Sequence, residues 1–256
     1  MPYLDLNGDP IYYALHRNQA EGLPVVLIHG AGENHLVWPS GLRRLCGTIV
    51  YAVDLPGHGK SGGAGQTTIA GYAAWLATLC EALKLPSVIL VGHSMGGAIA
   101  QWFALAYPER TAGIVLMATG AKLRVDPQLL HLAQNDYLAA VDLIGQREWG
   151  PAVPENIKAL GKQQLLANDA RVTSDDYRAC DAFDVRERLG TLKTPTLIIA
   201  GEVDQLAPLK YATYLAEHIP GARLVVAPQA GHMVMLEAAE LVTRAVAEFL
   251  RDQAAA

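Results

Sequence analysis

Short runs of consecutive apolar residues recur along this chain of 256 residues and constrain its fold more than any other feature. Each run is apolar at every position instead of at alternate positions, so both faces of the strand that it predicts must be covered by protein. Strands of this kind are typical of parallel sheets with helices on either side. The runs occupy residues 25–28, 49–53, 88–91, 114–117, 197–199 and 224–226.

Helix-like stretches separate these runs, so strand and helix alternate and the sequence predicts the α/β class. The N-terminal residues 3–17 differ, because Asn7-Gly8-Asp9-Pro10 divides them into two strand-like pieces. That pattern predicts a hairpin at one edge of the sheet. Helical spacing of apolar residues is clearest at Tyr72, Leu76, Leu79 and Leu83, and again at Val242, Val246, Phe249 and Leu250.

The stretch from residue 121 to residue 188 breaks the alternation, because it contains Leu-rich helical patterns and no strand-like run. An insertion of this length in an α/β chain is typical of a lid. We therefore expect a core domain formed by residues 1–120 and 189–256, with a small helical cap over 121–188. The cap carries more apolar residues than one helix face needs, and we expect some of them to line a cleft: Leu129, Leu130, Leu132, Leu138, Val141, Leu143, Ile144 and Trp149.

The composition excludes several classes of protein. With 51% hydrophobic and 18% charged residues, the chain can bury the core of one globular domain, and its net charge of −5 gives no general attraction to nucleic acid or anionic membranes. The first residues lack a basic and apolar leader, so we expect a cytoplasmic protein. Cys46, Cys80 and Cys180 have no metal-binding spacing, so we expect no metal and three buried thiols.

Gly92-His93-Ser94-Met95-Gly96 follows the run at 88–91 and precedes a helix-like stretch rich in small residues. A strand, a tight turn and a helix are the context that a G-x-S-x-G nucleophile elbow requires. The two glycines fit because a Cβ at either position would collide with the neighbouring backbone. Ser94 is therefore the candidate nucleophile.

A serine hydroxyl needs a base to remove its proton, and the base needs an acid to orient it. In a nucleophile-elbow fold these partners follow the serine on loops after later strands, the acid first. Asp204 follows the run at 197–199, and His232 follows the run at 224–226. Glu202 is a weaker candidate for the acid, because at the strand tip it is more typical of a solvated charge.

The charge that develops on the substrate oxygen needs two backbone N–H groups. Met95 supplies one, because it follows the nucleophile at a helix N-terminus. The loop His29-Gly30-Ala31-Gly32 supplies the other, with Ala31 as our choice and Gly30 as the alternative.

With these motifs in place, the chain resembles the α/β-hydrolase superfamily over essentially its whole length. Further matching pieces are Asp54-Leu55-Pro56-Gly57-His58-Gly59-Lys60-Ser61, Gly201-Glu202-Val203-Asp204 and Ala230-Gly231-His232. The resemblance implies a mostly parallel eight-stranded sheet with helices on both faces, a helical cap over Ser94, and the roles given above for Ser94, Asp204, His232, Met95 and Ala31. It implies a structural loop at Asp54 and no cofactor.

The resemblance does not fix the reaction, because esterases, enol-lactonases and carbon–carbon bond hydrolases look similar at this level. Ser94 stands where dehalogenases and epoxide hydrolases carry Asp, and His93 stands where carbon–carbon bond hydrolases tend to carry Asn. We expect hydrolysis of small neutral esters with short-to-medium acyl groups, with Gly30, His93 and Trp149 at the substrate. The alternatives are an enol-lactonase, a methyl esterase, a carbon–carbon bond hydrolase or, more remotely, a non-catalytic ligand receptor. The sequence leaves the oligomeric state open.

We expect a fluorophosphonate probe to label Ser94 covalently, because only an activated serine reacts with it. The substitution Ser94→Ala should abolish labelling and lower turnover of any ester substrate by on the order of 10⁶. Labelling is measured by intact mass, and turnover by steady-state kinetics. Residual activity above about a hundredth of the wild-type value would show that Ser94 is not the nucleophile.

Overall fold

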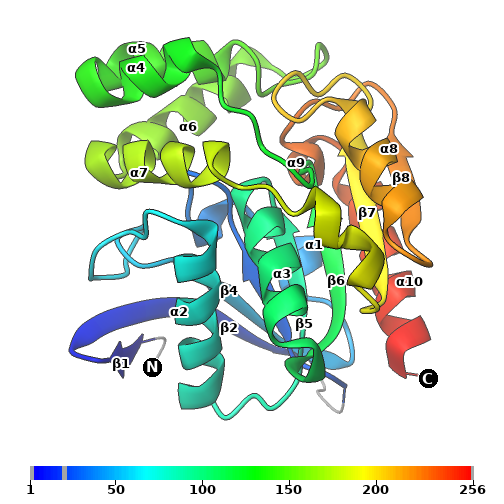
Figure 1. Cartoon of the computed structure of the whole chain (residues 1–256). Helices are drawn as coiled ribbons and strands as arrows, with labels where there is room; N and C mark the ends of the chain where they lie inside the picture. The colour runs from blue at the N-terminus through cyan, green and yellow to red at the C-terminus, as the bar shows by residue number, and fades with distance from the viewer. Residues whose placement is uncertain (1–2, 19–21, 255–256) are drawn as a thin grey trace.

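Eight strands form one sheet in the computed structural model, which describes residues 3–18 and 22–254 (Figure 1). Their order is β1-β2-β4-β3-β5-β6-β7-β8. β2 pairs antiparallel with both β1 and β4, and all other neighbours are parallel. The strands are β1 Tyr3–Leu6, β2 Asp9–Asn18, β3 Val25–Ile28, β4 Thr48–Val53, β5 Val88–His93, β6 Thr111–Met117, β7 Thr196–Gly201 and β8 Arg223–Ala227. All six apolar runs lie in strands and the hairpin forms an edge, so the predicted sheet is confirmed.

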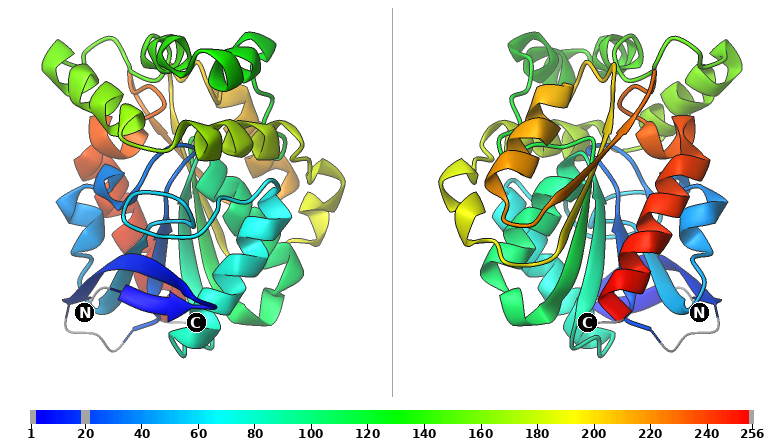
Figure 2. Two further views of the ribbon diagram at one scale, coloured as in Figure 1. Left: turned by 90° about the vertical axis from the view of Figure 1, so that its left-hand side faces the viewer. Right: turned by 90° about the vertical axis from the view of Figure 1, so that its right-hand side faces the viewer.

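Helices cover both faces of the sheet (Figure 2). Along β3, Val26 and Ile28 join the apolar cluster beneath α2 and α3, whereas Val25 and Leu27 join the cluster beneath α1 and α10. Burial of alternate residues on opposite faces explains why the run at 25–28 is apolar throughout. The helices are α1 Ser40–Arg43, α2 Ile69–Ala82, α3 Met95–Ala106, α4 Pro127–Asn135, α5 Tyr137–Gly145, α6 Glu155–Leu166, α7 Ala170–Asp181, α8 Leu209–His218, α9 Val234–Glu237 and α10 Ala239–Ala254, with 3-10 turns at His35–Val37, Pro108–Arg110 and Arg186–Thr191.

Four helices, α4 to α7, lie between β6 and β7 in the chain and stand over the carboxyl ends of the strands (Figure 1). We refer to residues 121–188 as the helical segment. Its helices have an apolar cluster of their own, which includes Leu129, Val141 and Leu165. Leu138, in contrast, is 55% exposed and faces solvent.

Asp176 of α7 fastens the helical segment to the sheet domain. Its carboxylate is fully buried and accepts hydrogen bonds from His58 Nε2 at 2.7 Å, Tyr72 Oη at 2.5 Å and the Gly32 backbone N–H at 2.9 Å. These donors come from three separate parts of the sheet domain. A buried carboxylate with this many donors holds one geometry, because any displacement leaves a charge without a partner.

The cysteines depart in part from expectation. Cys80 and Cys180 are buried, but Cys46 is exposed, because it lies in the loop between α1 and β4 outside the packed layers. The prediction of three buried thiols is therefore wrong for Cys46. Within residues 3–18 and 22–254, no helix is long and apolar enough to cross a membrane.

We expect Asp176→Asn to lower the free energy of unfolding by about 3 kcal/mol, because the substitution leaves buried donors of His58, Tyr72 and Gly32 poorly paired. The neighbouring Asp175→Asn is the matched control, since Asp175 meets only the exposed Arg178 at 3.5 Å. It should change stability by less than about 1 kcal/mol. Urea unfolding followed by circular dichroism measures both, and equal effects would contradict the role given to Asp176.

Candidate active site

Ser94 occupies the sharp turn between β5 and α3 with backbone angles φ 51° and ψ −114°. A non-glycine residue at positive φ is strained and is held there only by its surroundings. A Cβ on Gly92 would overlap the Gly96 carbonyl, and one on Gly96 would overlap the carbonyl of Ile28. The turn therefore brings β5, α3 and β3 into backbone contact, and it leaves the Ser94 side chain at the carboxyl edge of the sheet.

Asp204 and His232 meet behind this edge. His232 Nδ1 lies 2.8 Å from Asp204 Oδ2, and the other carboxylate oxygen accepts the N–H groups of Leu206 and Ala207 at 2.8 and 2.9 Å. Burial opposes ionisation of Asp204, but the facing His232 and the two N–H donors outweigh it and lower the pKa of the carboxyl group. An ionised Asp204 fixes the proton of His232 on Nδ1, which leaves Nε2 as the basic nitrogen.

Glu202 does not compete for this place. Its carboxylate is exposed and accepts the backbone N–H of Gln229 at 3.0 Å. Of the two acids considered from the sequence, Asp204 therefore contacts His232 and Glu202 does not.

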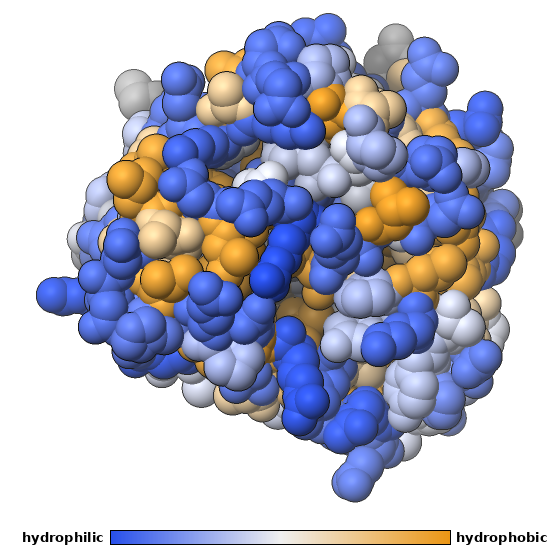
Figure 3. All heavy atoms as spheres, turned by 90° about the horizontal axis from the view of Figure 1, so that it is seen from above, coloured by the Kyte–Doolittle hydropathy of each residue, from blue (hydrophilic) through white to orange (hydrophobic). Residues whose placement is uncertain are grey.

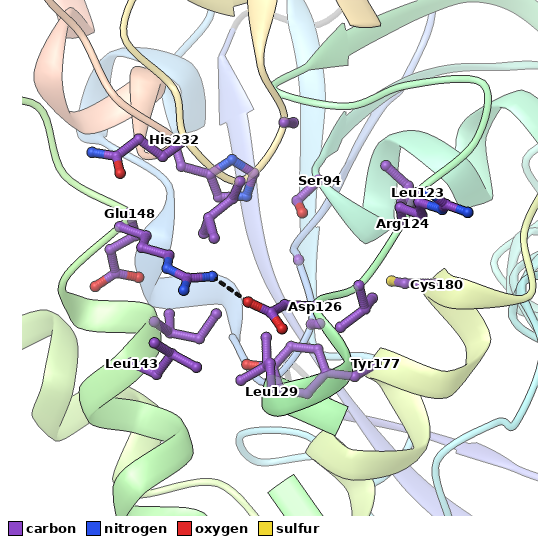
Figure 4. A pocket seen from close by; sticks show the side chains of 18 of the residues that line it. Ser94, Leu123, Arg124, Asp126, Leu129, Leu143, Glu148, Tyr177, Cys180 and His232 are labelled. Atoms are coloured by element: carbon purple, nitrogen blue, oxygen red, sulfur yellow. Dashed lines mark hydrogen bonds and ion pairs between the residues drawn. The ribbon is translucent and has the colours of Figure 1, made fainter. Parts of the chain in front are cut away.

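Ser94 and His232 both line one cavity of about 160 Å³ under the helical segment (Figure 4). Apolar side chains from the helical segment form much of its wall: Leu123, Leu129, Leu143, Ile144 and Leu165. Seen from above, the surface is hollowed near its centre, and apolar atoms lie inside the hollow between polar side chains (Figure 3). Three of the eight apolar residues expected to form a cleft, Leu129, Leu143 and Ile144, reach this wall.

Two backbone N–H groups near Ser94, those of Met95 and Ala31, make no hydrogen bond within the described part of the chain. Met95 is the first residue of α3, so its N–H has no partner inside that helix. Gly30 and Ala31 both line the cavity, but the Gly30 N–H is already bound to Glu33 Oε2 at 2.6 Å. The Ala31 N–H makes no hydrogen bond within the described part of the chain.

His93 is fully buried and does not line the cavity, which corrects the expectation that it contacts substrate. Its Nδ1 lies 3.1 Å from Glu33 Oε2, and its Nε2 lies 3.0 Å from the carbonyl oxygen of His232. Burial opposes protonation of His93, but Glu33 outweighs it and raises the pKa of the imidazole. His93 therefore holds the backbone of His232 in place through a hydrogen bond to its carbonyl oxygen.

Trp149 is 8% exposed and lies in the apolar cluster around α10, away from the cavity wall. The chain here packs tightly on the His232 loop, because Gly231 has no side chain to keep residues 148–150 away. The indole itself packs beside Gly161 of α6 and does not line the cavity, so the expected substrate contact of Trp149 is corrected as well. Of the three residues expected at the substrate, only Gly30 reaches the cavity.

Charged residues of the cavity were missed in the sequence. Asp126 and Arg147 pair across it at 2.7 Å, and the carboxyl groups of Glu33 and Glu148 also line it (Figure 4). Glu33 follows the glycine-rich loop directly and could have been found there. Asp126, Arg147 and Glu148 carry no motif, because the folding of the helical segment alone brings them to Ser94.

The comparisons with known proteins agree on the family of the chain, although the relatives differ in the reaction that they catalyse. A family model described as "Alpha/beta hydrolase family" matches residues 25–245. The 2-hydroxy-6-oxo-6-phenylhexa-2,4-dienoate hydrolase of Comamonas testosteroni is 30% identical over 94% of this chain and 92% of that protein. The solved structure of a thermophilic esterase is 34% identical with a TM-score of 0.85, covering 98% of this chain and 97% of the other. The enol-lactonase from Burkholderia xenovorans LB400 is 25% identical with a TM-score of 0.91, covering 98% and 100%.

We expect Asp204→Asn to lower kcat by roughly 10⁴, because an amide favours the wrong tautomer of His232. Glu202→Gln is the matched control and should leave kcat nearly unchanged, since its side chain is exposed and bonded elsewhere. Initial rates with one activated ester measure both. Equal losses in the two variants would remove Asp204 from the role of orienting acid.

Proposed function

The chain belongs to the alpha/beta hydrolase family, and we propose that it hydrolyses carboxylic esters with neutral, short-to-medium acyl groups through an acyl-enzyme on Ser94. The observation that carries this proposal is the buried Asp204–His232 pair, which opens onto the same small apolar cavity as Ser94. Nucleophile, base and acid then come from three loops at one edge of the sheet.

In this mechanism, His232 Nε2 takes the hydroxyl proton while Ser94 Oγ attacks the ester carbonyl carbon. The tetrahedral intermediate collapses, the alcohol leaves with the proton from His232, and an acyl group remains on Ser94. A water molecule then gives a proton to His232 and attacks the acyl carbon. The acid is released and Ser94 recovers its proton. The hydrogen bond of His232 to Asp204 stabilises the imidazolium in both halves.

The N–H groups of Met95 and Ala31 would hold the oxyanion of each intermediate. Gly30 is the poorer second donor, because withdrawing its N–H would leave Glu33 Oε2 with His93 alone. In measured systems, the loss of one such donor costs about 3 to 4 kcal/mol of transition-state stabilisation.

The size and charge of the cavity support the substrate class. A cavity of about 160 Å³ that is walled by leucine and isoleucine side chains favours small, apolar acyl groups. Asp126 and Arg147 offset each other's charges, and the other charged residues of the lining, Arg124, Glu33 and Glu148, give no net positive charge that would favour an anionic acyl group. We propose that residues 121–188 act as a cap, which sets the acyl length through Leu129, Leu143 and Ile144.

Carbon–carbon bond hydrolysis is the second candidate, favoured by the likeness to the dienoate hydrolase of Comamonas testosteroni. The two reactions use the same nucleophile and base, so the arrangement of these residues does not distinguish them. Parallel assays distinguish them, one with p-nitrophenyl butyrate and one with 2-hydroxy-6-oxo-6-phenylhexa-2,4-dienoate. A kcat/KM higher by on the order of 10² for the dienoate would replace ester hydrolysis as the proposed function.

We expect kcat/KM for p-nitrophenyl esters to rise about fourfold for each added CH₂ until the cavity is full, and then to fall. Leu143→Phe should move the optimum to a shorter acyl chain, because its ring takes up part of the cavity. Leu138→Phe is the matched control on the same helix, where the side chain faces solvent and the optimum should not move. A series from acetate to decanoate measures the optimum, and a profile that is flat or peaks on an anionic ester would contradict the apolar pocket.

A further inference from the structure

Glu148 is a buried carboxyl group in the cavity that the proposed mechanism does not use. It follows α5 in the chain, lines the same cavity as Ser94 and His232, and is 5% exposed (Figure 4). Its backbone carbonyl accepts the N–H groups of His232 and Met233 at 2.8 and 3.3 Å. The position of Glu148 is therefore tied to that of the catalytic base.

The side chain of Glu148 lacks the partners that an ionised carboxylate needs. Its Oε1 is buried without a hydrogen-bond partner among residues 3–18 and 22–254. The two other carboxylates nearby each have one oxygen that accepts hydrogen bonds: Glu33 Oε2 from the Gly30 N–H, with His93 Nδ1 at 3.1 Å, and Glu237 Oε2 from the N–H groups of Gly150 and Gly231 at 2.9 and 3.0 Å. Glu237 Oε1 is buried without a partner, as Glu148 Oε1 is, but no oxygen of Glu148 accepts a hydrogen bond from the described residues.

The basic residues next to Glu148 already have acidic partners, and Arg124, which also lines the cavity, lies on its opposite side (Figure 4). Arg147, the next residue in the chain, is bound to Asp126 at 2.7 Å, and His93 is bound to Glu33. The other titratable groups around it are the carboxyl groups of Glu33 and Glu237, the phenol of Tyr177 and the imidazole of His232. A negative charge on Glu148 would therefore meet mainly other acids, and the imidazole of His93 and the indole N–H of Trp149 lower the pKa of Glu148 by less than burial and Glu33 raise it.

These surroundings favour the protonated acid. Burial, followed by the repulsion of Glu33, raises the pKa of Glu148 to about 7. A neutral carboxyl group has an O–H that donates one hydrogen bond, whereas the ionised group only accepts. Below neutral pH the cavity thus holds a hydrogen-bond donor that no described residue of the protein receives.

We propose that Glu148 is a second proton-carrying residue of the active site, whose O–H binds an oxygen of the acyl group and whose ionisation switches turnover off. The proposal rests on the proposed ester hydrolysis and names its substrates more closely, as short acyl esters that carry an additional ether, hydroxyl or keto oxygen. An ionised Glu148 opposes turnover because its charge repels both that oxygen and the developing oxyanion.

The pH profile of kcat/KM tests the switch. Wild-type kcat/KM should fall as pH rises through about 7, because Glu148 ionises there. Glu148→Gln cannot ionise, so this alkaline fall should disappear, while kcat/KM at pH 6 drops a few-fold because an amide is the weaker donor. Glu155→Gln, on the exposed surface of α6, should keep the alkaline fall. A fall that persists in Glu148→Gln would overturn the proposal.

A pair of isosteric esters tests the donated hydrogen bond. p-Nitrophenyl methoxyacetate and p-nitrophenyl butyrate differ by an oxygen in place of a CH₂ group. The ratio of their kcat/KM values at pH 6 should fall up to about tenfold in Glu148→Leu, which has no donor, and much less in Glu148→Gln. Comparison between variants cancels the different reactivity of the two esters. An unchanged ratio in Glu148→Leu would show that the carboxyl group does not bind the acyl oxygen.

Thermal unfolding tests the proton on Glu148 without any substrate, so it separates this proposal from the proposed function. A carboxyl group with a raised pKa binds more protons in the folded state, so stability decreases as pH rises from the ordinary value toward about 7. Glu148→Gln lacks this decrease. The difference in Tm between Glu148→Gln and wild type should therefore increase by several degrees from pH 5 to pH 8, and a constant difference would overturn the proposal even if esters are hydrolysed.

Discussion

Backbone contact between β3, β5 and α3 is the constraint on which the rest of the structure depends. Gly92 and Gly96 let these elements approach so closely that no side chain fits between them. The approach forces Ser94 to positive φ and turns the chain directly from strand into helix. The same contact sets Met95 at the start of α3 directly after the serine, and Ala31 lines the same cavity as Ser94. The proposed nucleophile and oxyanion donors thus depend on one close contact, which a single Cβ would prevent.

The helical segment is hydrogen-bonded to two of the loops that surround Ser94. Asp176 of α7 accepts the N–H of Gly32, in the loop that carries Ala31. Between α5 and α6, the carbonyl of Glu148 accepts the N–H of His232. The segment therefore holds the loop of Ala31 at one point and the loop of His232 at another. Movement of these helices would disturb both, so the geometry of the site and the attachment of the proposed cap are coupled.

The sequence predicted those features that depend on local pattern. Continuous apolar runs gave the strands, and the order of strand ends led to Asp204 and His232, because parallel strands end at one edge. The misplaced residues depend on packing between distant segments. The sequence placed Trp149 at the substrate, yet its indole packs in the apolar cluster that includes α10 and beside Gly161 of α6. Glu148 carries no motif, and its missing counter-ion follows only from where Arg147 and His93 find their partners.

The histidines around Ser94 show how hydrogen bonding assigns the base. His29 Nε2 accepts the N–H of Leu55 and its Nδ1 bonds Gly30, and burial followed by the repulsion of His58 lowers its pKa to about 4. His93 uses both ring nitrogens, for Glu33 and for the carbonyl of His232. His232 uses Nδ1 for Asp204, and its Nε2 has no hydrogen-bond partner in the described chain. Proton transfer requires a free lone pair, so of these three buried rings only His232 is available for the proposed role of base.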